Sequence, residues 1–353
     1  MDDLSQYLIN KDANVVEALQ RIDLNSKGLL FVVDQNQVLE GVITDGDIRR
    51  WLIRTGNLKG KIESFLNRTP YVMHQRNIQA ARKKMDEKQI TAIPVVDDGG
   101  KLYDIVFYSA ANKKNESDAK SLKGVSVIIM AGGKGTRLYP YTKILPKPLI
   151  PIGDIPIMER IIRRFSETGI DSFYATVNYR ANMIKAYFAE QNYNLQYIDE
   201  NEPLGTAGSL RLIHKKFDRP VIVTNCDILI NANYQEIYEY HIKSGNELTI
   251  VSALKNITVP YGVLQTGQNG NVKGLEEKPQ LSYFVNTGMY ILDPKLLEEI
   301  PKDTFYHMTD LINMLIEKNR VVGMYPVSED SFLDMGEFEE MHRMEQKLNL
   351  KSE

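Results

Sequence analysis

The chain has 353 residues, of which 43% are hydrophobic and 25% are charged, and its formal net charge is −3. This length suits two domains of ordinary size, and the composition is that of a globular protein. A slightly acidic balance gives no electrostatic basis for binding nucleic acid or an acidic membrane surface.

The first 113 residues contain an internal repeat with a period of 63 residues. Residues 31–34, Phe-Val-Val-Asp, align with residues 94–97, Pro-Val-Val-Asp, under that shift. Each copy predicts a helix, a short apolar strand, a turn and a second strand, and the first copy adds a closing helix. Neither copy is large enough to bury a core well by itself. We therefore expect one α+β domain, residues 1–113, in which copies at about 1–58 and 60–112 pack together.

The first copy closes with Gly41–Ile48, which contains the pattern G-x-x-T-x-x-D after a predicted strand. This pattern resembles the cystathionine β-synthase (CBS) domain, which normally occurs as a tandem pair. The resemblance implies that Thr44 contacts a phosphate and Asp47 the ribose hydroxyls of an adenine nucleotide. The second copy has Phe107 and Ala110 at these places, so at most one site is expected to be competent. A purely structural or dimer-forming role stays open, because fold alone does not fix function.

A polar, charged stretch at residues 114–123 predicts a linker. Beyond it, strands are predicted at 125–131, 173–177, 197–198 and 221–224, helices at 155–168, 182–190 and 234–244, and hairpins or mixed strands at 248–254, 262–266 and 284–292. Because strands that alternate with helices favour parallel pairing, residues 124–353 are expected to form an open, mostly parallel, Rossmann-like α/β sheet.

A glycine-rich loop, Met130–Leu138, follows the first of these strands directly. Glycines let the backbone approach a ligand and turn its amides inward, which makes such a loop a phosphate cradle. Arg137, Lys143 and Lys147 add positive charge close by in sequence. The loop lacks the Gly-Lys-Ser/Thr end of a Walker A motif, and Leu138 stands where the dinucleotide fingerprint has its third glycine.

The loop and its continuation, Leu145–Ile152, read G-G-x-G-T-R-L…P-K-P-L-I-P-I. This pattern resembles the signature of the sugar-1-phosphate nucleotidyltransferases. The resemblance implies a sheet of the GT-A type whose glycine loop wraps a nucleoside triphosphate. It also implies that Arg137 and Lys147 hold the phosphates through charge-assisted hydrogen bonds.

Later segments match the same family in the same order, so the resemblance covers nearly all of the chain from Val125 onward. They are Pro203–Gly208, Asn225–Asp227, Glu276–Pro279, Val285–Tyr290 and Leu333–Gly336. The resemblance implies nucleotide contacts from Ala131, Gly132, Gly133, Gly135, Thr136, Gly205, Thr206 and Gly208, sugar-phosphate contacts from Glu277, Lys278, Asn286 and Gly288, and a magnesium ion on Asp227 and Asp334.

Each of these residues also has a plainer interpretation. Asp227 and Asp334 can cap the helices that follow them, and Glu277 with Lys278 can form a solvated hairpin pair. Taken singly, the plainer interpretations of Asp227 and of Glu277 with Lys278 are the better ones, whereas the ordered series of motifs favours function. Cys226 is expected to be a small buried hydrophobe, because no base is implied beside it.

The reaction implied by the resemblance is in-line attack of a sugar-phosphate oxygen on the α-phosphorus of a nucleoside triphosphate, with pyrophosphate leaving. A phosphomonoester has its second pKa near ~6, so its oxygen needs no general base at neutral pH. Bringing two polyanions together requires cations, here Mg²⁺ with Arg137 and Lys147. Lys278 would orient the sugar phosphate, and Glu277 would hold a sugar hydroxyl.

The segments Leu-Gly-Thr-Ala-Gly and Asn-Thr-Gly-Met-Tyr look closest to the guanylyltransferases of this family, so GTP is expected. Uridylyl, thymidylyl and cytidylyl transfer use the same scaffold and stay open. The candidate acceptors are mannose 1-phosphate, glucose 1-phosphate and an amino sugar 1-phosphate of nonulosonic acid synthesis.

Three other classes of protein stay open as well. A glycosyltransferase is disfavoured by Arg137 and Lys147 and by the lack of a D-x-D near Asp227, since the only Asp-x-Asp of that kind, Asp45–Asp47, lies in the first domain. A non-catalytic regulatory protein that senses nucleotide sugars would not need these charged residues. A cytidylyltransferase acting on a phosphate such as phosphocholine would differ in its acceptor.

The chain has a single cysteine, so no intramolecular disulfide can form. No apolar run is long enough to span a bilayer, and residues 1–5 lack the basic and apolar regions of a signal peptide. We expect a cytoplasmic protein without a nucleic-acid or membrane partner. Because paired modules that resemble CBS domains often self-associate, a homo-oligomer is expected.

Overall fold

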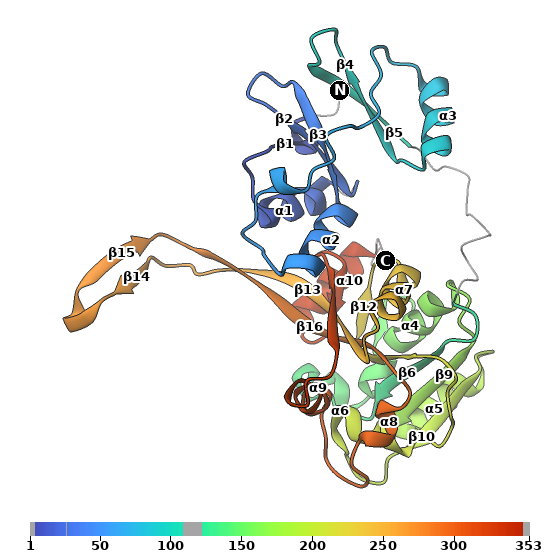
Figure 1. Ribbon diagram of the computed structural model, residues 1–353. Coiled ribbons are helices and arrows are strands. Elements are labelled where there is room, and N and C mark those ends of the chain that lie inside the picture. Colours follow the sequence, from blue (N-terminus) through green and yellow to red (C-terminus); the bar gives the residue numbers. More distant parts are fainter. Residues whose placement is uncertain (1–3, 26, 109–121, 349–353) are drawn as a thin grey trace. The chain divides into compact units, whose positions relative to one another are not determined.

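The computed structural model describes residues 4–25, 27–108 and 122–348 (Figure 1). The chain divides into two compact units, Met1–Lys114 with Leu254–Tyr283, and Asn115–Ala253 with Phe284–Glu353. The linker predicted at residues 114–123 lies outside the described residues except for Leu122 and Lys123. Within the described ranges, no helix combines the length and the apolar character needed to cross a membrane.

The N-terminal unit contains the two copies of the repeat. The first copy comprises β1 (Leu8–Asn10), α1 (Val15–Asn25), β2 (Leu29–Val33), β3 (Leu39–Thr44) and α2 (Asp45–Thr55). The second copy comprises α3 (Ile78–Lys88), β4 (Ala92–Val96) and β5 (Leu102–Phe107). The helix α3 and the strands β4 and β5 each start 63 residues after α1, β2 and β3, so the predicted period is confirmed.

Strands from both copies build one core in this unit. All five residues of β2 and all five of β4 are buried. One buried cluster combines Leu29, Phe31 and Val33 of the first copy with Val96, Leu102 and Ile105 of the second. The backbone N–H of Leu39 donates to the carbonyl of Gly100, which adds a hydrogen bond between the copies. The expectation that the copies pack together is therefore confirmed.

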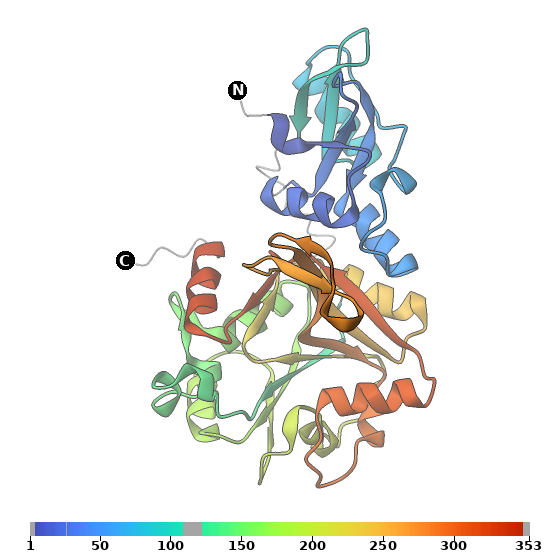
Figure 2. The ribbon, with the colours of Figure 1, turned by 90° about the vertical axis from the view of Figure 1, so that its left-hand side faces the viewer.

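The C-terminal unit is built on a seven-stranded sheet with helices on both sides (Figures 1 and 2). In order across the sheet, the strands are β10 (Leu195–Asp199), β9 (Ser172–Val177), β6 (Ser126–Ala131), β11 (Val221–Asn225), β16 (Gln280–Leu292), β13 (Leu248–Thr258) and β17 (Val322–Val327). The α-helices are α4 (Ile157–Ser166), α5 (Ala181–Ala189), α6 (Gly205–Gly208), α7 (Tyr234–Ser244), α8 (Leu296–Glu299), α9 (Met308–Glu317) and α10 (Phe338–Lys347).

Most of the strand pairs in this sheet are parallel. The strands β10, β9, β6 and β11 run parallel to their neighbours, as do β13 and β17, whereas β16 runs antiparallel to β11. All six residues of β6 are buried, as the continuous apolar run of a central parallel strand predicts. The predicted open, mostly parallel α/β sheet is confirmed.

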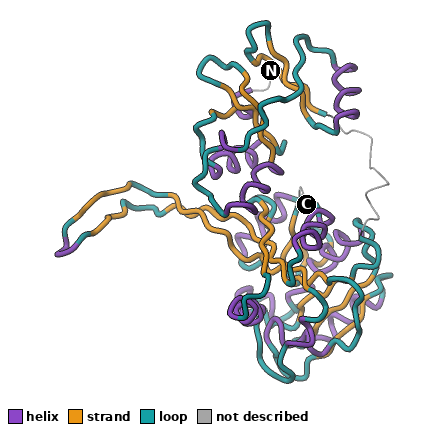
Figure 3. The backbone as a smooth tube through the Cα atoms, viewed as in Figure 1, coloured by secondary structure: helices purple, strands orange, loops and turns teal. Residues whose placement is uncertain are grey.

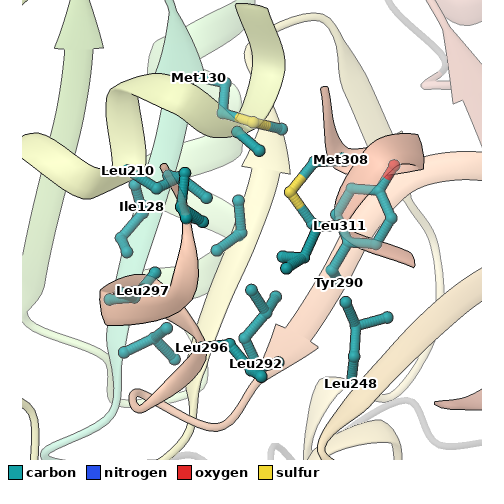
Figure 4. Close-up of a cluster of buried hydrophobic side chains, with 14 of the residues drawn as sticks. Ile128, Met130, Leu210, Leu248, Tyr290, Leu292, Leu296, Leu297, Met308 and Leu311 are labelled. Carbon is teal, nitrogen blue, oxygen red and sulfur yellow. The ribbon is translucent and has the colours of Figure 1, made fainter. Parts of the chain in front are cut away.

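One large cluster of apolar side chains fills the space between this sheet and its helices (Figure 4). It brings Ile128 and Met130 of β6 together with Leu292 of β16 and with Met308 and Leu311 of α9. At about 25 cal/mol per Å² of buried apolar surface, side chains of this kind stabilise the fold by roughly 1.5–3 kcal/mol each. The core therefore fixes the strand ends that carry the loops described below.

The strands β13 and β16 are longer than the strands predicted at 248–254 and 284–292. They run into an arm, residues 254–283, which continues as the hairpin of β14 (Val263–Thr266) and β15 (Val272–Glu276). The predicted turn lies at its tip, where Asn269 and Gly270 have φ values of 58° and 74° (Figure 3). Most residues of β14 and β15 are exposed, so a hydrophobic pattern could not mark their full length.

A buried histidine on α7 is expected to make the protein lose stability in acid. His241 is 2% exposed, its Nδ1 lies 2.8 Å from Thr249 Oγ1, and burial lowers its pKa from the ordinary 6.5 to about 4, against a smaller opposing effect of Asp293. The unfolded chain takes up this proton below pH 6.5 and the folded chain only near pH 4, so stability is lost as the pH falls between those values. The difference is worth about 3 kcal/mol.

Urea unfolding at several pH values between 4 and 7 checks this expectation. His241→Asn, which can still hydrogen-bond Thr249, is expected to remove this part of the pH dependence. The exposed His214→Asn serves as the matched control and is expected to leave it unchanged. Equal slopes of unfolding free energy against pH in the wild type and His241→Asn would contradict the assignment.

Candidate active site

The predicted loops meet at the carboxyl ends of two adjacent parallel strands. The glycine loop follows β6. Asn225 is the last residue of β11, which pairs with β6 in parallel, and Cys226 and Asp227 follow it. Ligands of open α/β sheets bind at this edge. A pocket of about 480 Å³ opens here. Of the predicted site residues, its walls include Gly132, Gly133, Gly135, Thr136, Arg137, Lys147, Gly205, Thr206 and Asp227.

Close approach of side chains explains two of the glycines in the loop. Gly135 has a φ of 63°, and a Cβ there would lie 3.1 Å from Lys147 Cβ. A Cβ on Gly132 would clash with Glu200 Oε1. The hydroxyl of Thr142 donates to the carbonyl of Gly135 at 2.8 Å, which anchors the turn. The loop therefore keeps its shape only with small residues at these positions.

The two predicted metal aspartates lie at the ends of two paired strands. Asp227 directly precedes β12 (Ile228–Ile230), which pairs with β18 (Phe332–Asp334), and Ile228 is the register partner of Asp334. The N–H of Met335 donates to the carbonyl of Asp227 at 2.9 Å. Burial raises the pKa of Asp334, and the negative charge of Asp227 raises it further. The two carboxylates are thus close enough to repel each other.

Cations already face this carboxylate pair. Lys147 Nζ forms an ion pair with Asp227 Oδ2, and both side chains are mostly buried. Burial and the charge of Asp227 raise the pKa of Asp334, and the positive charges of Lys147 and Arg137 partly offset that rise. No group of three or more His, Cys, Asp or Glu residues that could hold a metal is found in the described ranges. Two carboxylates nevertheless fit Mg²⁺, which keeps several waters and takes further oxygens from substrate phosphates.

The nucleoside stretch predicted at Pro203–Gly208 is hydrogen-bonded to the segment Thr304–Met308, which lies outside the motifs identified in the sequence. The carbonyl of Tyr306 accepts hydrogen bonds from the N–H groups of Ala207 and Gly208 at 2.9 and 3.0 Å. A Cβ on Gly208 would lie 2.6 Å from the carbonyl oxygen of Thr304. Gly208 therefore serves backbone packing behind the pocket wall, while Gly205 and Thr206 face it.

Glu200 is a pocket residue that the sequence reasoning missed. It follows β10, is 8% exposed, and accepts a hydrogen bond from the N–H of Leu204 at 3.3 Å. Burial raises its pKa, and the hydrogen bond from the Leu204 N–H opposes that shift. A carboxylate two residues beyond the strand predicted at 197–198 was the available signal. The pocket also contains Met130, Thr176, Pro203, Asn225, Cys226, Phe305 and His307, which were not predicted to bind.

The other predicted site residues lie outside the lining of this pocket. Gly288 packs against Asn225, because a Cβ on Gly288 would clash with the Asn225 side chain, and its N–H donates to Oδ1 of the exposed Asn286 at 2.9 Å. Ala131 is buried at the end of β6. Glu277 and Lys278 belong to the arm, where they directly follow β15.

Cys226 has the buried, inert character that was expected. Its side chain is 7% exposed, and burial followed by the charge of Asp227 raises its pKa to about 12. The thiolate needed for nucleophilic attack is therefore absent at neutral pH.

The N-terminal unit has a pocket of its own, of about 620 Å³, between the two copies. Thr44 and Asp47 line it together with Tyr71 and Lys88 and with apolar residues such as Phe31. Thr44 caps α2, and its N–H and hydroxyl donate to Asp47 Oδ2 at 2.9 and 2.6 Å. Phe107 is not part of this lining, and Ala110 lies outside the described residues.

The sequence matches two families of known proteins. Residues 126–350 match the family described as nucleotidyl transferase, and residues 7–54 and 62–109 each match the CBS domain. The resemblance to a tandem CBS pair is thereby confirmed.

Several relatives carry the name mannose-1-phosphate guanyltransferase. The protein from Debaryomyces hansenii is 34% identical over 196 residues, which cover 50% of this chain and 54% of that protein. The protein from Aspergillus fumigatus is 35% identical over 187 residues, or 50% and 51% of the two chains. The chain spans about half the length of the relatives it matches.

Among solved structures, HddC from Yersinia pseudotuberculosis is similar with a TM-score of 0.51 and 27% identity. The similarity covers 64% of this chain and 99% of HddC. A second crystal structure of HddC, complexed with GMP-PN, gives a TM-score of 0.50.

Proposed function

Because the chain belongs to the nucleotidyl transferase family, we propose that it transfers a guanylyl group from GTP to a sugar 1-phosphate. The products would be a GDP-sugar and pyrophosphate. The observation that carries the proposal is one pocket in which the glycine loop, Arg137, Lys147 and Asp227 occur together with a buried carboxylate, Glu200. The names of the relatives support the same reaction.

In this reaction an oxygen of the sugar phosphate attacks the α-phosphorus and the bond to the bridging oxygen of the β-phosphate breaks. Arg137 and Lys147 bind phosphate oxygens and neutralise the charge that gathers on the leaving pyrophosphate. Asp227 and Asp334 would hold a magnesium ion, which would supply Lewis-acid stabilisation of the phosphoryl oxygens. Cys226 takes no part, because its thiol stays protonated.

Glu200 supports guanine as the base. A carboxylate only accepts hydrogen bonds, and guanine presents two adjacent donors, N1–H and the 2-amino group. Uracil and thymine present one N–H between two carbonyls, and adenine and cytosine present one amino group beside an acceptor nitrogen. Burial raises the pKa of Glu200, and two N–H donors from guanine would stabilise its charged form.

We propose mannose 1-phosphate as the first acceptor to test, because several relatives are named for it. Asn286 and Gly288, next to Asn225 of the pocket lining, and Glu277 and Lys278 on the arm are the proposed sugar-phosphate residues. Glucose 1-phosphate and amino sugar 1-phosphates are the other acceptors, and uridylyl, thymidylyl or cytidylyl transfer is the alternative reaction.

Pyrophosphate release tests the proposal, with GTP, UTP, dTTP and CTP each offered with the three classes of sugar 1-phosphate. We expect release from GTP with one acceptor, in the presence of Mg²⁺ and not in EDTA. Release from a different nucleotide would overturn the guanine assignment. No release from any pair, with adenine nucleotides both present and absent, would favour a regulatory protein without catalytic activity.

We further propose that the N-terminal pocket binds an adenine nucleotide that regulates the enzyme. Its combination of an apolar wall with Thr44, Asp47 and Lys88 suits a base, a ribose and a phosphate. A homo-oligomer acting in the cytoplasm is part of the same proposal.

Adenine nucleotides are expected to raise the melting temperature of the wild type. At a hundredfold excess over Kd, binding stabilises a protein by about 2.7 kcal/mol, which is several degrees for a small unit. Asp47→Asn retains a side-chain acceptor for the α2 cap and removes the charge that would meet the ribose, so the shift should largely disappear. The control Asp12→Asn changes an exposed carboxylate of the same unit. A full shift in Asp47→Asn would exclude the assigned site.

A further inference from the structure

The segment Thr304–Met308 contributes Phe305 and His307 to the active-site pocket, although it lies outside the motifs identified in the sequence. It is held against the nucleoside stretch at several points. The Tyr306 N–H donates to the Leu204 carbonyl at 2.9 Å, and the Met308 N–H donates to Thr206 Oγ1 at 2.9 Å. The segment therefore forms one rigid wall with the stretch proposed to bind the nucleoside.

The exposed aromatic side chain in this wall is Phe305. Its side chain is 60% exposed, yet it lines the pocket. Its ring meets the ring of His307 edge to face, with centroids 4.7 Å apart and an interplanar angle of 81°. One face of an apolar ring is thus open to the pocket in a segment whose backbone is fixed.

His307 holds that aromatic ring in place. Its backbone N–H donates to Asp310 Oδ2 at 2.7 Å, and its Nδ1 lies 3.4 Å from both N and Oγ1 of Thr206. Because Nδ1 faces a backbone N–H, it acts as an acceptor, and a neutral ring carries its proton on Nε2. These contacts fix the ring against which Phe305 packs.

His307 contacts Thr206 of the stretch proposed to bind the nucleoside, and Phe305 packs on His307, so both aromatic side chains belong to the part of the pocket lining formed with that stretch. We propose that Phe305 is the stacking platform for the nucleotide base and that His307 is the residue that positions it. This inference rests on the proposed function. Phe305 covers the face of the base, while Glu200 reads its edge.

Stacking acts on affinity and does not depend on the identity of the base, since every base has a π-face. Loss of one aromatic platform weakens binding by about ten- to a hundredfold. It does not change the reacting phosphates, so kcat and the KM for the sugar 1-phosphate should stay within about twofold of the wild type.

The first test is isothermal titration of the full chain with GTP and Mg²⁺, without a sugar phosphate. Phe305→Ala is expected to raise the Kd about ten- to a hundredfold, with the same ratio between GTP and inosine triphosphate as in the wild type. Ile316→Ala, an exposed apolar residue of the following helix α9, is the matched control. An unchanged Kd in Phe305→Ala would overturn the stacking assignment, whereas no binding of any nucleotide to the wild type would overturn the proposed function instead.

The second test uses fluorescence. The chain has a single tryptophan, Trp51, in the N-terminal unit. Phe305→Trp should bind GTP about as tightly as the wild type and should add a signal that GTP quenches. Ile316→Trp should show no such quenching. Tight binding by Phe305→Trp without quenching would also overturn the proposal.

Discussion

Replacing Asp227 by asparagine should lower kcat by at least about a hundredfold, and up to a thousandfold, while the fold survives. Asp227 forms the ion pair with Lys147 and lies beside Asp334, at the carboxyl end of β11. Asparagine has the same shape but no charge, so a cation held between the two side chains would lose half of its carboxylate partners. The remaining activity should require a higher Mg²⁺ concentration than that of the wild type.

Initial rates of pyrophosphate release over a series of Mg²⁺ concentrations measure this effect. Asp171→Asn, an exposed carboxylate of the same unit, should leave kcat unchanged. Asp334 remains beside Lys147 in the Asp227→Asn variant, so the melting temperature should change little. Unchanged turnover in that variant would show that this carboxylate is not at the reacting centre.

The parts of the fold that could be predicted are those whose signal lies within a short stretch of chain. The buried strands β6 and β11 are rich in apolar residues, and the repeat of 63 residues reproduces α1, β2 and β3 in α3, β4 and β5. The glycine loop was recognisable because backbone conformation and close packing restrict its residues, as Gly132 and Gly135 show.

The missed residues depend on contacts between distant parts of the chain. His307 lies 101 positions after Thr206, and only the packing of α9 against the sheet brings them together. Phe305 has no pattern of its own, because a single aromatic residue in a loop is most often a packing residue. Glu200 was missed because it stands between two other acidic residues, Asp199 and Glu202, and matched no motif, and only the order β10-β9-β6-β11 places that strand end beside the glycine loop.

The proximity of the two aspartates also depends on a contact between distant parts of the chain. A family resemblance assigned both Asp227 and Asp334 to a metal, but no sequence spacing could show that they meet. The antiparallel pairing of β12 with β18 brings them together, because it makes Asp334 the register partner of Ile228. The raised pKa of Asp334 is the electrostatic consequence of that pairing and of burial.

Replacing Glu200 by glutamine should lower kcat/KM for GTP by about a hundredfold and abolish the preference for GTP over inosine triphosphate. Glutamine offers one acceptor and one donor, so its amide would oppose one of the two N–H groups of guanine and leave buried donors unpaired. Each such buried loss costs about 1–3 kcal/mol. Adenine presents an acceptor beside a donor, which an amide can match, so ATP should improve relative to GTP.

The comparison of GTP, inosine triphosphate and ATP separates base reading from a merely structural role of Glu200. The carbonyl of a glutamine can still accept the N–H of Leu204, so the wall of the pocket should persist. Glu202→Gln, two residues away and exposed, is the matched control and should keep the wild-type preference. If Glu200→Gln retained the wild-type ratio of GTP to inosine triphosphate, the carboxylate would serve to join the loops at Gly132 and Leu204, and the base would have to be read by other groups.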